Sequence, residues 1–246
     1  MIKLVLDPGH GGKDPGAVGN GLVEKNLNLE LSMRVAGKLA DYDAAVTLTR
    51  SFDTDLSLDE RCDIANNLGA DLFCSLHTNS GGGTGFESFI HTSAGTKTES
   101  IRNVIHDMMA DYYNSVGFRD RGKKRADFAV LRNTVMPAVL LENFFIDNPK
   151  DAVILKDVIF FDRLAEVIAG GIVKALGVPL KSPQPHGEQG SSITTPFTYQ
   201  SMTPGQDFFS EIARLKAEGW LNGEHQPDDP VTWGELAAVI NRLRDR

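Results

Sequence analysis

Cysteine is scarce in this sequence, with Cys62 and Cys74 the only two among 246 residues. Both lie in segments whose pattern is typical of buried regular structure, which favours packing as small apolar side chains. Two thiols cannot form an all-cysteine zinc site, and the count argues against a disulfide-stabilised fold.

Long apolar runs are also absent, since no stretch approaches the about 18 uncharged apolar residues that a membrane span needs. Residues 1–10 lack the basic region, longer apolar stretch and cleavage site of a signal peptide, and predict the first strand of a folded domain. The sequence therefore predicts synthesis in the cytoplasm, with no membrane span and with another route to any site outside the cell.

Positive charge is not in excess, because 33 acidic side chains outnumber 25 Lys and Arg and give a formal net charge of −8. This balance argues against nucleic acid as a partner. It does not exclude an anionic polymer as a substrate. The apolar share of 41% is ordinary for a globular protein with a real core.

Strand-like and helix-like segments alternate over residues 1–177. The pattern predicts strands at 2–6, 45–49, 72–76, 86–90 and 137–141. It predicts helices from residue 24, at 56–68 with Ser57 and Glu60 as a capping box, at 100–116 and at 157–176. This order predicts an α/β fold, a three-layer sandwich with a mostly parallel central sheet flanked by helices.

The composition changes after residue 180. Residues 178–205 are predicted to be a Ser/Thr/Pro/Gly-rich linker, although a long surface loop would have a similar composition. Residues 206–246 carry two helical patterns and predict a small all-α module, too short to bury much core alone. Docking or self-association through this module is the expectation.

Polar side chains follow two of the predicted strands. His10 lies in a glycine-rich loop after the first strand, His77 ends the third, and Glu24 opens the first helix. Open α/β sheets bind ligands at the carboxyl ends of their strands. Two imidazoles and a carboxylate meeting there would make a three-ligand zinc site with an open fourth position.

Glu142 emerges from an apolar strand at the same predicted edge. Burial would raise its pKa and suit it to act as the general base of a zinc hydrolase. Each residue alone has an ordinary explanation: a structural histidine at a strand end, Glu24 favouring a helix N-terminus, or Glu142 in a salt bridge. Spacing by itself leaves these alternatives open.

The sequence resembles the zinc-dependent N-acetylmuramoyl-L-alanine amidases of bacterial autolysins and phage endolysins. The resemblance covers nearly all of residues 1–177 in ordered blocks, which comprise 6–17, 21–25, 48–50, 58–61, 65–66, 70–73, 75–79, 130–132, 136–142 and 145–149.

The resemblance implies that His10, Glu24 and His77 bind one zinc ion and that Glu142 is the catalytic carboxylate. It also implies substrate contacts for Asn79 and Arg132. The family usually has glycine after the catalytic Glu-x pair, where this chain has Phe144. This change is expected to leave the carboxylate in place and to reshape the pocket beside it.

Other candidates carry weaker signals. His91 and His106 are expected to have surface or packing roles, and His186 and His225 to be solvated. The basic cluster 119–125 would meet carboxylates of the substrate or form a solvated loop. Residues 212–237 resemble a single copy of a surface-layer-homology motif, which implies binding to the cell wall or self-association.

The predicted function is hydrolysis of the amide bond between N-acetylmuramic acid and L-alanine in bacterial peptidoglycan. Without a signal peptide, a phage or prophage endolysin released by a holin is favoured. The alternatives are a zinc peptidase that cuts stem peptides and a catalytically inactive wall-binding protein.

Overall fold

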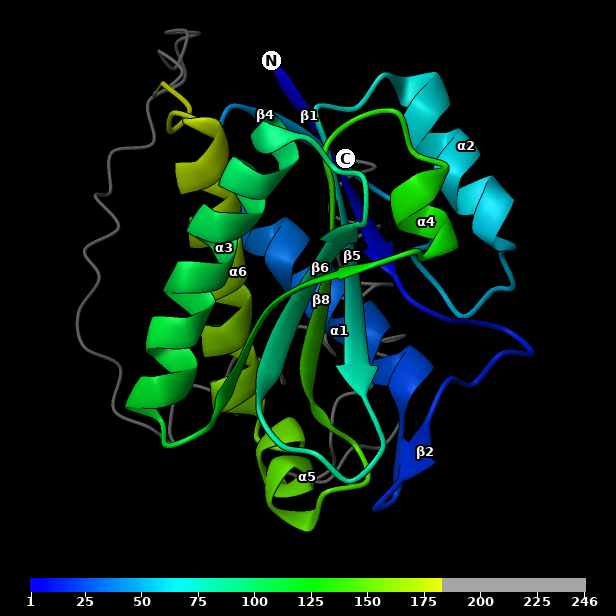
Figure 1. Ribbon diagram of the computed structural model, residues 1–246, viewed down its shortest axis with the longest axis vertical. Coiled ribbons are helices and arrows are strands. Elements are labelled where there is room, and N and C mark those ends of the chain that lie inside the picture. The colour runs from blue at the N-terminus through cyan, green and yellow to red at the C-terminus, as the bar shows by residue number, and fades with distance from the viewer. Residues whose placement is uncertain (183–246) are drawn as a thin grey trace, which may run out of the picture. The chain divides into compact units, whose positions relative to one another are not determined.

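The computed structural model describes residues 1–182 (Figure 1). The strands are β1 (Ile2–Pro8), β2 (Val18–Gly19), β3 (Leu22–Val23), β4 (Ala44–Leu48), β5 (Leu72–Asn79), β6 (Phe86–His91), β7 (Asp120–Ala126) and β8 (Ala138–Phe145). The helices are α1 (Glu24–Leu39), α2 (Leu58–Leu68), α3 (Thr96–Ser115), α4 (Ala129–Arg132), α5 (Pro149–Leu155) and α6 (Val158–Leu176).

Six strands form one sheet in the order β4-β1-β5-β8-β6-β7. Strands β4, β1, β5 and β8 are parallel to one another. Strand β6 is antiparallel to β8, and β7 is parallel to β6. The short strands β2 and β3 form a separate hairpin that leads into α1.

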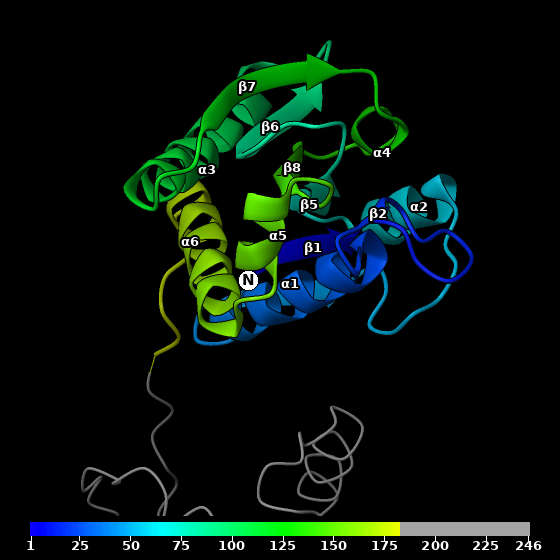
Figure 2. The same ribbon diagram turned by 90° about the horizontal axis from the view of Figure 1, so that it is seen from below.

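Helices cover both faces of the sheet, as Figure 2 shows, with α1, α3 and α6 on one face and α2 and α4 on the other. The larger apolar core lies under α1, α3 and α6 and includes Leu31, Ile105 and Ile168. The smaller core lies under α2 and α4 and includes Phe73 and Leu140. The predicted three-layer α/β sandwich with a mostly parallel sheet is confirmed.

The smaller core ends partway along the strands. Successive side chains of a strand alternate between the two faces, so Phe73, Ser75 and His77 of β5 share the face of α2 and α4. Leu140 and Glu142 of β8 lie on this same face. The face is therefore apolar where α2 and α4 cover it and polar toward the carboxyl ends of β5 and β8.

Local signals in the sequence account for most of the elements. Ser57 caps α2, accepting a hydrogen bond from the Glu60 backbone N–H while the Glu60 side chain accepts from Ser57, so the predicted capping box is confirmed. Helix α6 ends at Leu176, and Gly177 has the left-handed conformation common after a helix. Cys62 and Cys74 are free and buried, as predicted.

The main difference concerns residues 119–125, for which a solvated loop was one of two expectations. Residues 120–126 instead form the edge strand β7, paired with β6. Most residues of this segment are charged and none is a large apolar residue, so it lacks the apolar alternation by which a strand is found in a sequence. Strand pairing, which the sequence does not display, decided the structure.

The first residues of the predicted linker contact the sheet domain. Tyr42 and Leu180 form an isolated bridge, and the Lys181 N–H donates to the Asp41 carbonyl. The rest of the predicted linker and the module at 206–246, with His186 and His225, lie outside the described residues. Within 1–182, no helix is long and apolar enough to cross a membrane.

Phe144 has a left-handed backbone, with φ of 60°. This conformation is costly for a side chain with a Cβ atom and is the reason why glycine suits the position. The Phe144 ring is fully buried and packs against Tyr113, Phe118 and Phe160. It lies in the larger core, on the face away from Glu142, so packing offsets the strain and leaves the carboxylate in place.

Of the variants Phe144→Ala and Phe144→Gly, the one with the smaller side chain should therefore have the higher free energy of unfolding. Both variants lose the ring and should unfold with a free energy lower by about 3–5 kcal/mol. Phe144→Gly should be the more stable of the two by about 1 kcal/mol, because glycine relieves the backbone strain. Urea unfolding measures both, and an alanine variant more stable than the glycine variant would contradict this account of the position.

Candidate metal centre

The loop after β1 is held by two buried arginines. Arg50 donates to the carbonyl oxygens of Pro8 and Gly9 at 3.0 and 2.9 Å. Arg61 donates to the carbonyls of Pro8 and His10, both at 2.7 Å, and pairs with the buried Asp7 at 2.8 Å. His10 itself has a φ of 62°, so these bonds hold a backbone conformation that histidine rarely adopts.

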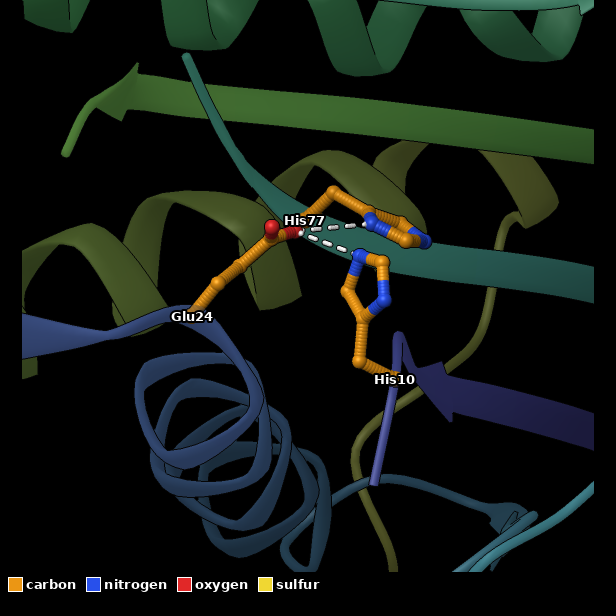
Figure 3. Close-up of side chains that lie close together, drawn as sticks. All are labelled: His10, Glu24 and His77. Carbon is orange, nitrogen blue, oxygen red and sulfur yellow. Dashed lines mark hydrogen bonds and ion pairs between the residues drawn. The ribbon is translucent and has the colours of Figure 1, made fainter. Parts of the chain in front are cut away.

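Three predicted ligands meet at the carboxyl edge of the sheet (Figure 3). The carboxylate of Glu24, from the first turn of α1, lies beside the imidazoles of His10 and His77 and faces one nitrogen of each. Its Oε1 is 3.1 Å from Nε2 of His10 and 3.0 Å from Nδ1 of His77. One ligand atom from each residue lies within 4.8 Å of the others.

A second layer of hydrogen bonds orients these side chains. Asp14 Oδ2 is 2.7 Å from Nδ1 of His10, which directs Nε2 toward Glu24. The Ala17 N–H donates to Glu24 Oε2, and the Asn28 side chain donates to Oε1. Such partners fix the orientation of metal ligands and the tautomer of a ligand histidine.

Two glycines give the cluster its space. A Cβ atom on Gly9 would lie 2.1 Å from the His77 ring. Gly16 has a φ of 64°, and a Cβ atom there would lie 2.6 Å from Glu24 Oε2. Both positions exclude larger side chains because the ligands occupy the space beside the backbone.

The charges of the cluster favour a cation at its centre. Hydrogen bonding to Glu24 raises the pKa of His10 to about 9. Burial opposes charge on Glu24 and on His77 and is the largest single influence on each, but the hydrogen bonds and opposite charges of the cluster together outweigh it, so that the pKa of Glu24 is lowered and that of His77 is raised. In the metal-free protein, protons on the imidazoles therefore balance the negative charge of Glu24, which a bound metal cation would balance instead. Two imidazole nitrogens and a carboxylate oxygen are a donor set that suits zinc.

Glu142 lies beside the cluster on the next strand. It is directly opposite His77 in the pairing of β5 with β8. Burial raises the pKa of Glu142 to about 7, and its Oε2 atom is buried with no hydrogen-bond partner among the described residues. A buried, unpaired carboxylate next to a metal site is poised to exchange a proton with a bound molecule.

The two predicted substrate contacts lie in different places. Asn79 follows His77 on the same face of β5 and donates to Glu87 of β6 at 2.9 Å. Arg132 ends α4, pairs with Asp127 and lines a small pocket with His91 and Ala138. Ala138 and Glu142 are four residues apart on β8, or about 13 Å. Asn79 therefore adjoins the cluster, and Arg132 lies toward the opposite end of the strands.

Some residues of the site have no predicted role. Arg50 and Arg61 fall in blocks of the family resemblance, yet nothing in their spacing shows that their guanidinium groups bind the His10 loop. Asp14, four residues after His10, is a stronger signal because a nearby carboxylate is the usual second partner of a ligand histidine. His106 is buried in α3, 2.7 Å from Ser88 Oγ, which agrees with its expected packing role.

The fold and this edge together define an α/β protein with two histidines and a glutamate that could hold a metal ion, beside a further carboxylate, which is the arrangement expected of a metal-dependent hydrolase. Residues 4–174 match the model of the N-acetylmuramoyl-L-alanine amidase family. The chain belongs to this family.

Relatives with amidase or endolysin names are similar to this chain over most of its length. A sporulation-specific N-acetylmuramoyl-L-alanine amidase of Bacillus subtilis is 46% identical over 180 residues, covering 72% of this chain and 69% of the relative. An endolysin of Bacillus phage SPP1 is also 46% identical, over 74% of this chain and 69% of its own length. The catalytic domain of the amidase CwlV from Bacillus (Paenibacillus) polymyxa var. colistinus is 40% identical with a TM-score of 0.67, covering 72% of this chain and 99% of that one.

Metal binding should compete with protons at this cluster. Because the pKa of His10 is about 9 in the metal-free protein, this imidazole is protonated at pH 7 and must release its proton to bind a metal. The apparent affinity for zinc should rise with pH, up to about ten-fold per unit for each displaced proton, until the pH passes about 9. Calorimetric titration in two buffers of different ionisation enthalpy measures this proton release.

His77→Ala should abolish tight zinc binding, while His91→Ala, at the other end of the sheet, should retain it. Equal affinity at pH 6 and pH 8 would contradict the proposed ligand set.

Proposed function

We propose that this chain hydrolyses the amide bond between N-acetylmuramic acid and the first L-alanine of the stem peptide in bacterial peptidoglycan, with zinc held by His10, Glu24 and His77. The observation that carries the proposal is the position of Glu142 directly opposite His77, with its Oε2 atom buried and without a hydrogen-bond partner among residues 1–182. Membership of the amidase family supports the choice of this amide bond as the one that is cut.

Each side chain has a distinct role in this reaction. Zinc, when bound, supplies a Lewis acid that activates water and the scissile carbonyl. Glu142 takes the proton of the attacking water as general base and returns it to the leaving amine of the stem peptide. Its raised pKa suits both steps, since a group with a pKa near neutrality accepts and donates protons with similar ease.

The supporting residues keep the site in order. Asp14 and Asn28 hold two of the ligands, and the arginines fix the loop of His10. The polar end of the sheet face, which α2 and α4 leave uncovered, gives the substrate its approach.

The biological setting has two candidates. Relatives at equal identity include a sporulation amidase of a bacterium and an endolysin of a phage. Action on the cell wall suits both, and the order of catalytic domain, linker and small module that the sequence predicts, which resembles that of endolysins, favours the phage or prophage origin. Wall binding or self-association by residues 206–246 remains part of this proposal.

Glu142→Gln should test the proposal directly. The amide keeps the shape of the carboxylate but cannot act as a base, so kcat on purified peptidoglycan should fall by about 100- to 10,000-fold. Mass spectrometry of the soluble products should show free stem peptides beginning with L-alanine for the wild type. Zinc affinity should stay close to that of the wild type, because Glu142 is not one of the three ligands.

Glu30→Gln is a matched control, since Glu30 pairs with Arg34 on the surface of α1. It should cut as fast as the wild type. Products cleaved within the stem peptide would move the chain to the zinc peptidases. A zinc-loaded wild type that releases nothing from several wall types would favour the inactive wall-binding protein.

A further inference from the structure

The polar floor of the sheet continues past Glu142 across two more strands. In the antiparallel pairing of β8 with β6, Glu87 lies directly opposite Glu142, so the two side chains share a face. Glu87 accepts hydrogen bonds from Arg121 and Lys124 of β7. A row of side chains therefore runs from His77 through Glu142 and Glu87 to β7.

The end of this row carries unbalanced positive charge. Burial opposes ionisation of Glu87, but its bonds from Lys124 and Arg121 lower its pKa and keep it charged. One carboxylate thus faces two cations, which leaves these three ion-paired side chains with one net positive charge. The side chains of Arg121 and Lys124 are 28% and 37% exposed, so both can reach a bound molecule.

Neighbouring basic residues of β7 face the other way. Lys123 pairs with Asp107, and Arg125 pairs with Glu99, both on α3. The strand therefore divides its cations between the two faces of the sheet. Only Arg121 and Lys124 among these four share the face of Glu142.

Two aromatic rings also constrain the positions of the two cations. The Arg121 guanidinium lies 4.7 Å from the centre of the Phe145 ring, and the ammonium of Lys124 lies 5.6 Å from that of Phe89. Aromatic rings attract cations and restrict where they rest. Glu87 and these rings act as positioning groups that hold the two charges on the face of the sheet shared with Glu142.

We infer that Arg121 and Lys124 form a subsite for a carboxylate of the peptide part of the substrate. Strands β8 and β7 are two steps apart in the sheet, or about 10 Å at about 4.8 Å per step. An extended peptide covers this distance in about three residues. The carboxylate is thus carried by the second or third residue beyond the scissile amide. This inference rests on the proposed function, because that function places the scissile bond beside Glu142.

The test uses two soluble muramoyl-peptide substrates. In one, the free carboxyl groups of the second and third peptide residues are ionised. In the other, the same carboxyl groups are amidated, and nothing else differs. The zinc-loaded protein should cleave the ionised substrate with a kcat/KM about ten-fold higher, through a lower KM. Arg121→Gln and Lys124→Gln should each raise KM for the ionised substrate alone and bring the ratio toward one. Both should keep the zinc affinity of the wild type, which verifies that they fold.

Lys123→Gln is the matched control, because it removes a cation from the same strand on the opposite face. It should keep the ten-fold preference. A wild type that cleaves both substrates equally would overturn the subsite alone, as would variants at Arg121 and Lys124 that keep the preference. A wild type that cleaves neither substrate would overturn the proposed function, and the subsite with it.

Discussion

The site depends above all on the adjacency of β1, β5 and β8. Pro8 pairs with Leu76 and His77 pairs with Glu142, so residues far apart in the chain end their strands side by side. Parallel strands place their carboxyl ends at one edge, and this register brings the His10 loop, His77 and Glu142 within reach of one another. A shift of one residue in β8 would turn Glu142 to the opposite face.

Among the described residues, some buried charged side chains near this edge of the sheet have bonding partners, and one does not. Asp7 pairs with Arg61, and both Arg61 and Arg50 donate to carbonyls of the His10 loop, so these charges serve a rigid backbone. Glu142 Oε2 has no such partner within residues 1–182. The contrast separates supporting residues from those available for chemistry, because an unpaired buried carboxylate costs stability and persists where function requires it.

The same face of the sheet serves both packing and chemistry. Phe73 and Leu140 fill the core beneath α2 and α4, while two residues further along their strands the side chains become polar. Strand β7 extends this polar region to the edge of the sheet. Along this one row the chemistry changes from the candidate metal ligands next to β5 to a cationic edge on β7.

Much of this could be read from the sequence. Apolar periodicity and caps predict the helices and the buried strands, because those signals are local. His10, His77 and Glu142 stand out because they follow or end strands, and Glu24 because it opens a helix. All four also lie in blocks that resemble the amidases. Tertiary structure decided the rest. Strand β7 lacks a local signal and forms by pairing with β6, and the roles of Arg50, Arg61 and Glu87 arise from partners distant in the chain. Hydrogen bonds and ion pairs between such residues depend on strand register and packing, which no local pattern encodes.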